Sequence, residues 1–185
     1  MKKKIKKILV VLGGTSRERK VSLETGKACI KAIKRLGYKV DTLDPAKKQL
    51  SDINKKNIDL IFNALHGKDG EDGNIQSYFE YLKIPYTHSG VIPSAIAMDK
   101  DLSKKIFIKN GILTPKYISY SFNKSNSELV NLIKKKMKFP VVVKPLNEGS
   151  SVNVFICSKL NIIKNIQLLK NYKKIIIEEF IPGRE

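Results

Sequence analysis

Residues 8–19 read ILVVLGGTSRER, and this segment sets the architecture of the first half of the chain. A run of five apolar residues that stops at two glycines predicts a buried β-strand followed by a tight loop. A helical pattern then extends over about 22–36. We expect Ser22 to cap that helix at its amino end and Gly37 to end it, because these residue types satisfy the free backbone groups of helix termini.

The same alternation of short apolar runs and helical patterns continues along the chain. Further strands are predicted at about 39–43, 59–65 and 84–87, and the polar glycine loop 66–73 leads directly into a helix. Such alternation is typical of an α/β fold with mainly parallel strands. We therefore interpret residues 1–93 as a small, doubly wound, Rossmann-like domain, whose strand-to-helix loops gather at the edge of the sheet where ligands bind.

A second α/β domain is predicted over residues 94–185. The loop 145–151 joins two of its strands. Its predicted elements are helices at about 101–110, 127–137 and 161–169, and strands at about 140–144, 152–157 and 175–179.

The composition favours a globular protein of the cytoplasm. Hydrophobic residues make up 42% of the 185 residues, so a core can be buried. No apolar run approaches the roughly 18–20 residues that a membrane-spanning helix needs. The apolar run 8–12 is too short for a signal peptide and is followed by charged residues. Cys29 and Cys157 lie far apart and suit a reducing compartment. We expect a cytoplasmic protein without a membrane partner.

The formal net charge of +19 allows two interpretations. Such an excess is common in proteins that bind nucleic acids. However, nearly all the positive residues are lysines, which are scattered and are not interleaved with aromatic residues as in single-strand-binding surfaces. We favour a solvated surface and expect no nucleic-acid partner. A basic nucleic-acid-binding module is the alternative, and a steep salt dependence of binding would favour it.

Three polar side chains of the first domain could contact a substrate. Glu18 lies between a strand and a helix, where a carboxylate could hold an ammonium group, although a surface charge cluster is the alternative. His66 ends the third strand, and Glu71 follows in the same loop. This pair could hold a substrate carboxylate or tune a proton, or His66 could be an ordinary loop residue. His88 is interpreted as structural, and no spacing of potential ligands indicates a metal site.

Two segments of the second domain suit a nucleotide. The loop 145–151 offers backbone amides around a glycine, which can form an anion-binding nest, and Lys144 adds a charge for phosphate. The alternative is a β-hairpin with a solvated lysine. The strand at 175–179 and the apolar linker after it could hold a purine, with Glu185 accepting hydrogen bonds from ribose hydroxyls. A solvated strand end would have the same sequence pattern.

Taken together, these motifs resemble the D-alanine–D-alanine ligases of the ATP-grasp superfamily, and the resemblance covers the whole chain. It implies a Rossmann-like preATP-grasp domain followed by the first part of an ATP-grasp domain. The motifs, in order, are GGTSRERKVSL at 13–23, ALHG at 64–67 with GEDG at 70–73, MDK at 98–100, VKP at 143–145 with EGSSV at 148–152, and EEFIPGRE at 178–185.

The resemblance also implies a reaction. Such enzymes transfer the γ-phosphate of ATP to the carboxylate of one D-alanine, and the amine of a second D-alanine then attacks the acyl phosphate. The product is a dipeptide for peptidoglycan synthesis, and Mg²⁺ or Mn²⁺ assists. The family also suggests a homodimer. A related ligase that uses D-lactate or D-serine as its second substrate is the closer alternative.

Residue roles carry over by position in the motifs. Glu18 would bind the ammonium of the first D-alanine and Ser150 would help position the second, as the two expected catalytic residues. His66 would contact the substrate carboxyl region, with Glu71 orienting it. The expected ATP-binding residues are Lys100 and Lys144 at the phosphates, Ser151 in the covering loop, Glu178, Glu179 and Ile181 beside adenine, and Glu185 at the ribose.

The resemblance stops at the end of the chain. Family members continue for a further segment that carries a mobile substrate loop, an arginine and the metal-binding acids, and none of these matches a residue here. We therefore expect the carboxyl-terminal part of the ATP-grasp domain and all metal ligands to be missing from this chain, and little or no ligase activity from it alone.

Overall fold

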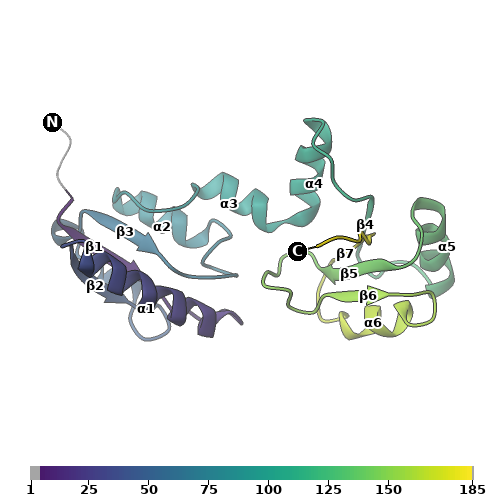
Figure 1. Ribbon diagram of the computed structural model, residues 1–185, viewed down its shortest axis with the longest axis horizontal. Helices are drawn as coiled ribbons and strands as arrows, with labels where there is room; N and C mark the ends of the chain where they lie inside the picture. Colours follow the sequence, from purple (N-terminus) through teal and green to yellow (C-terminus); the bar gives the residue numbers. More distant parts are fainter. Residues whose placement is uncertain (1–4, 185) are drawn as a thin grey trace. The chain divides into compact units, whose positions relative to one another are not determined.

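The computed structural model describes residues 5–184, and the chain divides into two compact units between Ile96 and Ala97. Figure 1 shows the elements of each unit in sequence colours. The first unit contains a three-stranded sheet and the second a four-stranded sheet. Both units combine helices with strands, so the predicted α/β class is confirmed.

The first unit contains a parallel sheet with the strand order β2-β1-β3. The bounds of its elements are β1 Lys7–Val11, α1 Arg19–Arg35, β2 Lys39–Leu43, two short 3₁₀ helices at Leu50–Asp52 and Lys55–Asn57, β3 Leu60–Asn63 and α2 Asn74–Leu82. Helix α3 follows at Val91–Met98.

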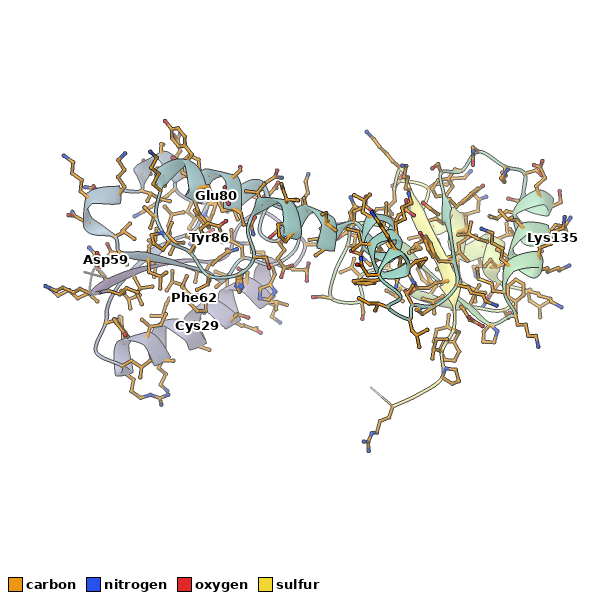
Figure 2. All side chains as sticks on the ribbon, turned by 90° about the horizontal axis from the view of Figure 1, so that it is seen from above. Cys29, Asp59, Phe62, Glu80, Tyr86 and Lys135 are labelled. Atoms are coloured by element: carbon orange, nitrogen blue, oxygen red, sulfur yellow. The ribbon has the colours of Figure 1, made fainter. Side chains whose placement is uncertain are left out.

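Helices cover both faces of this sheet because successive residues of β1 point in opposite directions. Ile8 and Val10 pack in one buried cluster with Ile33 of α1. Leu9 and Val11 pack in a second cluster with Phe79 of α2. In Figure 2, the labelled Cys29 and Phe62 lie between α1 and the sheet. This two-sided burial is the arrangement expected for a doubly wound domain.

The second unit contains an antiparallel sheet with the order β4-β7-β5-β6. Apolar residues of α5, α6 and the sheet share one buried cluster, which includes Ile133, Ile166 and Ile177. The bounds are α4 Lys100–Lys109, β4 Tyr117–Tyr120, α5 Asn126–Lys136, β5 Val141–Pro145, β6 Phe155–Cys157, α6 Ile162–Leu168 and β7 Ile175–Glu179.

The structure differs from the sequence-based expectations in four respects. The expected parallel pairing is present in the first sheet, but the second sheet is antiparallel. The expected strand at 84–87 is a single bridge between Ile61 and Tyr86. Strand β4 and helix α3 were not predicted. Finally, α1 begins at Arg19, so Ser22 lies within the helix and does not cap it.

The predicted solvated lysine surface is represented by Lys135, which is exposed on α5 (Figure 2). Among residues 5–184, no helix is both long enough and apolar enough to span a bilayer.

Candidate functional site

Two loops of the first unit lie side by side at the carboxyl edge of the parallel sheet. The loop 13–16 follows β1, and the loop 66–73 follows β3, its neighbour in the sheet. Both loops line a cavity of about 310 Å³. Parallel strands end at a common edge, and ligands of doubly wound folds bind there.

Arg19 and Asp44 fix the first of these loops. The amide of Gly14 donates to Asp44 Oδ1 over 3.0 Å, and Arg19 Nη1 donates to the carbonyl of Gly14 over 2.7 Å. The guanidinium also forms two hydrogen bonds with the carboxylate of Asp44. The hydrogen bond from Arg19 is the main reason that the pKa of Asp44 falls to about 2.

Ser22 connects the segments that directly follow β1 and β3. Its Oγ accepts a hydrogen bond from the amide of Gly13 over 2.7 Å and donates to the carbonyl of Ala64 over 2.7 Å. The amide of Ser22 already donates to the carbonyl of Glu18 within the first helical turn. The side chain of Ser22 is completely buried. It therefore bridges the ends of β1 and β3 and does not cap the helix.

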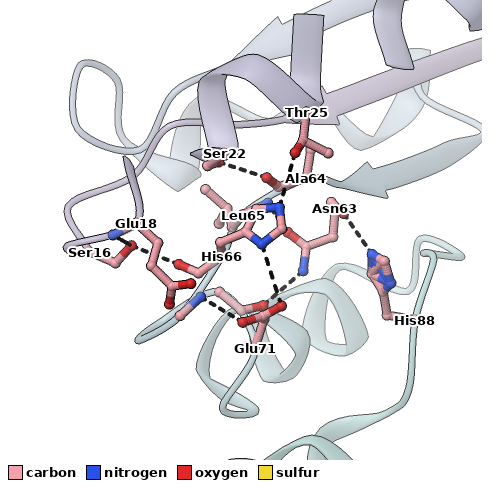
Figure 3. Close-up of polar contacts among 12 residues, drawn as sticks. Ser16, Glu18, Ser22, Thr25, Asn63, Ala64, Leu65, His66, Glu71 and His88 are labelled. Atoms are coloured by element: carbon pink, nitrogen blue, oxygen red, sulfur yellow. Dashed lines mark hydrogen bonds and ion pairs between the residues drawn. The ribbon is translucent and has the colours of Figure 1, made fainter. Parts of the chain in front are cut away.

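Glu18 lies at the amino end of α1 and is 95% buried, with a relative exposure of 5%. Its amide donates a hydrogen bond to Ser16 Oγ over 3.2 Å, and this hydroxyl in turn donates to the carbonyl of His66 over 2.7 Å. Glu18 Oε2 lies so close to Gly67 that an added Cβ at Gly67 would be 2.3 Å from it. The structure therefore brings Glu18 next to the loop that begins at His66 (Figure 3).

His66 and Glu71 contact each other within this second loop. His66 Nδ1 is 3.8 Å from Glu71 Oε1, and His66 Nε2 is 3.3 Å from the hydroxyl of Thr25 on α1 (Figure 3). Glu71 Oε2 accepts a hydrogen bond from the amide of Gly67 over 2.7 Å. Two carboxylates, those of Glu18 and Glu71, therefore adjoin Gly67, beside an imidazole.

Buried amides support this loop from beneath. Asn63 Nδ2 and Gln76 Nε2 each donate to the carbonyl of Gly70 over 2.9 Å. His88 Nε2 lies 2.8 Å from the carbonyl of Asn63, which agrees with a structural role for His88. The loop is thus held by α2 and by β3.

In the second unit, Lys144 of β5 forms an ion pair with Glu178 of β7. Val142 pairs with Glu178 in the sheet, so Lys144 lies two residues along β5 on the same face. The opposite face packs against α5 and α6. Lys104 of α4 approaches the other carboxylate oxygen of Glu178, with 3.0 Å between Nζ and Oε2. A lysine-rich cluster thus lies on the face of the sheet that α5 and α6 do not cover.

Lys100, the first residue of α4, belongs to the same cluster. Its ammonium donates to the carbonyls of Leu146 and Glu148 at the start of the loop between β5 and β6. Burial lowers the pKa of Lys100, and repulsion from Lys144 lowers it further. Lys100 therefore links α4 to the loop in which a phosphate-binding nest is predicted.

The loop between β5 and β6 connects two antiparallel strands, so the hairpin connection that was weighed as the alternative is present. Ser150 and Ser151 are exposed and have positive φ angles of 46° and 57°. The hairpin does not leave Lys144 in solvent, because Lys144 pairs with Glu178. The predicted role of Ser150 in positioning the second D-alanine stays a prediction.

The predicted adenine-binding residues follow one another at the end of β7. Glu179 is half-buried and its amide donates to the carbonyl of Lys116, whereas Ile181 is exposed after the strand. Glu185 lies outside the described residues.

Sequence reasoning missed Asp44 and Lys104. Asp44 directly follows β2 at the ligand-binding edge, and this position was the available signal. Lys104 is four residues after Lys100 and therefore shares its helix face.

Within residues 5–184, no group of three or more His, Cys, Asp or Glu side chains could hold a metal ion.

Two family models match the chain. The model described as D-ala D-ala ligase N-terminus matches residues 40–89, and the model described as D-ala D-ala ligase C-terminus matches residues 106–185. The first range includes His66 and Glu71, and the second includes Lys144 and Glu178.

Curated relatives named D-alanine--D-alanine ligase are similar over almost the whole chain. The relative from Pelagibacter ubique is 59% identical over 180 residues, and that from Carboxydothermus hydrogenoformans is 44% identical over 183 residues. Each alignment covers 97% of this chain and 59% of the relative. The chain therefore spans about three-fifths of the length of these relatives.

Solved structures of D-alanine--D-alanine ligases are also similar to this chain. A D-alanine--D-alanine ligase from Bacillus anthracis superposes with a TM-score of 0.83 at 36% identity, covering 96% of this chain and 58% of that protein. The ATP complex of the B. anthracis ligase superposes with a TM-score of 0.79 at 35% identity, with coverages of 96% and 60%.

Proposed function

Because the chain belongs to the D-alanine–D-alanine ligase family, we propose that it serves the ATP-dependent joining of two D-alanine molecules into a dipeptide for peptidoglycan synthesis. The observation that carries this proposal is the cluster at the edge of the first sheet, where the buried Glu18 adjoins the loop of His66 and Glu71.

This cluster suits a small zwitterion. We propose that the carboxylate of Glu18 binds the ammonium of the first D-alanine, because this carboxylate lies against Gly67 in the loop that carries His66 and Glu71. His66 would then contact the substrate carboxylate, and Glu71 would orient the imidazole across the 3.8 Å between their atoms. In this proposal the first unit is the substrate-binding domain.

The lysine cluster of the second unit suits a nucleotide. We assign Lys100 and Lys144 to the phosphates of ATP, Ser151 to the loop that covers them, and Ser150 to positioning of the second D-alanine. Glu178, Glu179 and Ile181 would lie beside adenine, and Glu185 is proposed at the ribose. The ATP complex of a similar ligase supports nucleotide binding by this chain.

The proposed chemistry has two displacements. A carboxylate oxygen of the first D-alanine attacks the γ-phosphorus of ATP, and ADP leaves. The amine of the second D-alanine, after losing a proton, attacks the acyl carbon, and inorganic phosphate leaves. The lysines would stabilise the transferring phosphoryl group by fixed positive charge. Family members use Mg²⁺, but the described residues contain no fitting ligand set, so no step here is assigned to a metal.

Two further features are proposed on the basis of the family. We place the enzyme in the cytoplasm, where ATP is supplied, and we propose that it acts as a homodimer. Both are testable on the purified protein and in cells.

The proposal can be tested by titrating the isotope-labelled chain with D-alanine, L-alanine and ATP while amide resonances are recorded. D-alanine should shift the resonances of Gly67 and its neighbours, L-alanine should not, and ATP should shift the loop 146–151. Glu18→Gln should abolish the response to D-alanine, whereas Glu24→Gln, an exposed change nearly two turns further along, should preserve it. Equal responses to both enantiomers, or none to ATP, would refute the proposal.

A further inference from the structure

Lys104 is a buried lysine that the proposed reaction does not use. It lies on α4 with a relative exposure of 7%. Its ammonium is surrounded on every side: by Glu178 Oε2 at 3.0 Å, by the hydroxyl of Thr114 at 2.7 Å and by the carbonyl of Pro115 at 3.0 Å. The ring of Tyr117 lies beneath it, with 5.2 Å between Nζ and the ring centroid. These contacts engage all three donors of the ammonium.

Such a closed environment leaves Lys104 no room to bind a ligand directly. Its three hydrogen-bond partners come from the loop after α4 and from β7, so the ammonium holds a fixed position between the helix and the sheet. The only ionised partner among them is Glu178. The effect of Lys104 on any neighbouring site must therefore pass largely through that carboxylate.

Glu178 is shared between two lysines. One oxygen contacts Lys104 and the other contacts Lys144, which is more exposed than either partner. A carboxylate that is divided in this way holds each ammonium less tightly than a carboxylate with one partner would. Lys104 thereby limits how strongly Glu178 retains Lys144.

We propose that Lys104 is a positioning residue for phosphate binding. By engaging one oxygen of Glu178, it weakens the contact of the other oxygen with Lys144. The ammonium of Lys144 is then oriented by Glu178 but can still contact a phosphate. The consequence for phosphate rests on the proposed function of Lys144. Lys100, Lys104 and Lys144 gather three ammonium groups around Glu178, and the carboxylates of Glu148 and Asp99 also act on Lys100.

The first test is Lys104→Met, which keeps the apolar stem and removes the ammonium. Glu178 should then pair with Lys144 alone, and the affinity of the chain for ATP should fall about tenfold, the equivalent of one charge-assisted hydrogen bond. The affinity for adenosine should fall much less, because adenosine lacks phosphates. Lys105→Met, the adjacent exposed lysine on α4, should change neither affinity.

A double mutant separates positioning from a simple loss of charge. If Lys104 acts through Glu178, Lys104→Met should no longer weaken ATP binding once Glu178→Gln is present. The reason is that Lys144 can be held away from phosphate only by an ionised carboxylate at position 178. If Lys104 attracts phosphate directly, the loss should be equally large in both backgrounds, and that result would overturn the proposal. Calorimetric titration of the four proteins with ATP and adenosine provides the comparison.

A measurement without nucleotide keeps the inference separate from the proposed function. The side-chain ¹³Cε and ¹⁵Nζ resonances of Lys144 should move in Lys104→Met and stay in place in Lys105→Met. An unchanged Lys144 signal would overturn the proposal, whether or not ATP binds. A moved signal in a chain that binds no ATP would support the link from Lys104 to Lys144 and would refute the nucleotide site instead.

Discussion

Arg19 and Asp44 face each other as a two-pronged ion pair, with 2.9 Å between Nη1 and Oδ1 and 2.7 Å between Nη2 and Oδ2. Arg19 is the first residue of α1, and Asp44 directly follows β2. Both also bind Gly14, one through its carbonyl and the other through its amide. The pair therefore fixes the glycine loop that begins the proposed substrate site.

Asp44→Asn should lower the free energy of unfolding by about 2 kcal/mol at pH 7, since the native state shifts the pKa of this carboxyl from 3.8 to about 2. A lowered pKa stabilises the folded state fully above the unfolded value and less as the pH falls. The difference between the two proteins should thus shrink between pH 4 and pH 2 in urea titrations.

The control for Asp44→Asn is Asp41→Asn on β2, the strand that Asp44 follows. Asp41 pairs with Lys7 at the surface and is about half exposed, so its loss should cost less than about 1 kcal/mol. A gap for Asp44→Asn that stayed constant down to pH 2 would contradict the assignment of its stability to the ionised carboxylate.

Much of the fold is predictable because its strands are short apolar runs bounded by glycines or polar residues. The strand predicted at 175–179 has the bounds of β7, and the carboxyl-edge loops fall where β1 and β3 end. The direction of the second sheet was not readable, because helices separate several of its strands and a helix can join parallel or antiparallel neighbours. Strand β4 follows Pro115 without a strong apolar run.

Ser22→Ala should destabilise the protein by about 1–3 kcal/mol, because it leaves the buried amide of Gly13 and carbonyl of Ala64 without their shared hydroxyl. Ser77→Ala is the matched control, since Ser77 is an exposed serine within α2. Thermal and urea unfolding of the two variants measure the difference. Equal stability of both would show that the bridge contributes nothing.

The candidate site residues could be named from motifs, but their pairings could not. Glu178 was assigned to adenine from its place on β7, whereas its carboxylate lies between Lys104 and Lys144. These partners are separated by tens of residues, and only the antiparallel register of β5 and β7 brings two of them to one face. The same holds for Arg19 and Asp44, which meet because β2 is the neighbour of β1.

Phe79→Ala should be more damaging than any of the polar changes. Phe79 of α2 has no exposed surface and packs with the sheet residues of its cluster, so its removal should cost about 3–5 kcal/mol. Tyr81→Ala, on the exposed side of the same helix, should cost far less. Comparable losses in the two variants would contradict the assignment of this helix face to the core.

Gly67→Ala should impair both stability and the response to D-alanine, for two separable reasons. Its φ of +69° disfavours any side chain by about 1–2 kcal/mol. In addition, the new Cβ would lie 2.3 Å from Glu18 Oε2, so the carboxylate must move away.

Gly37→Ala isolates the first effect, because Gly37 has a φ of +84° and an added Cβ there would have no neighbour within 4 Å. Unfolding measurements should therefore show a loss in both variants, larger for Gly67→Ala, while resonance titrations should show a weakened D-alanine response only for Gly67→Ala. A D-alanine response that survives in Gly67→Ala would mean that the position of the Glu18 carboxylate against this glycine is not what the ligand recognises.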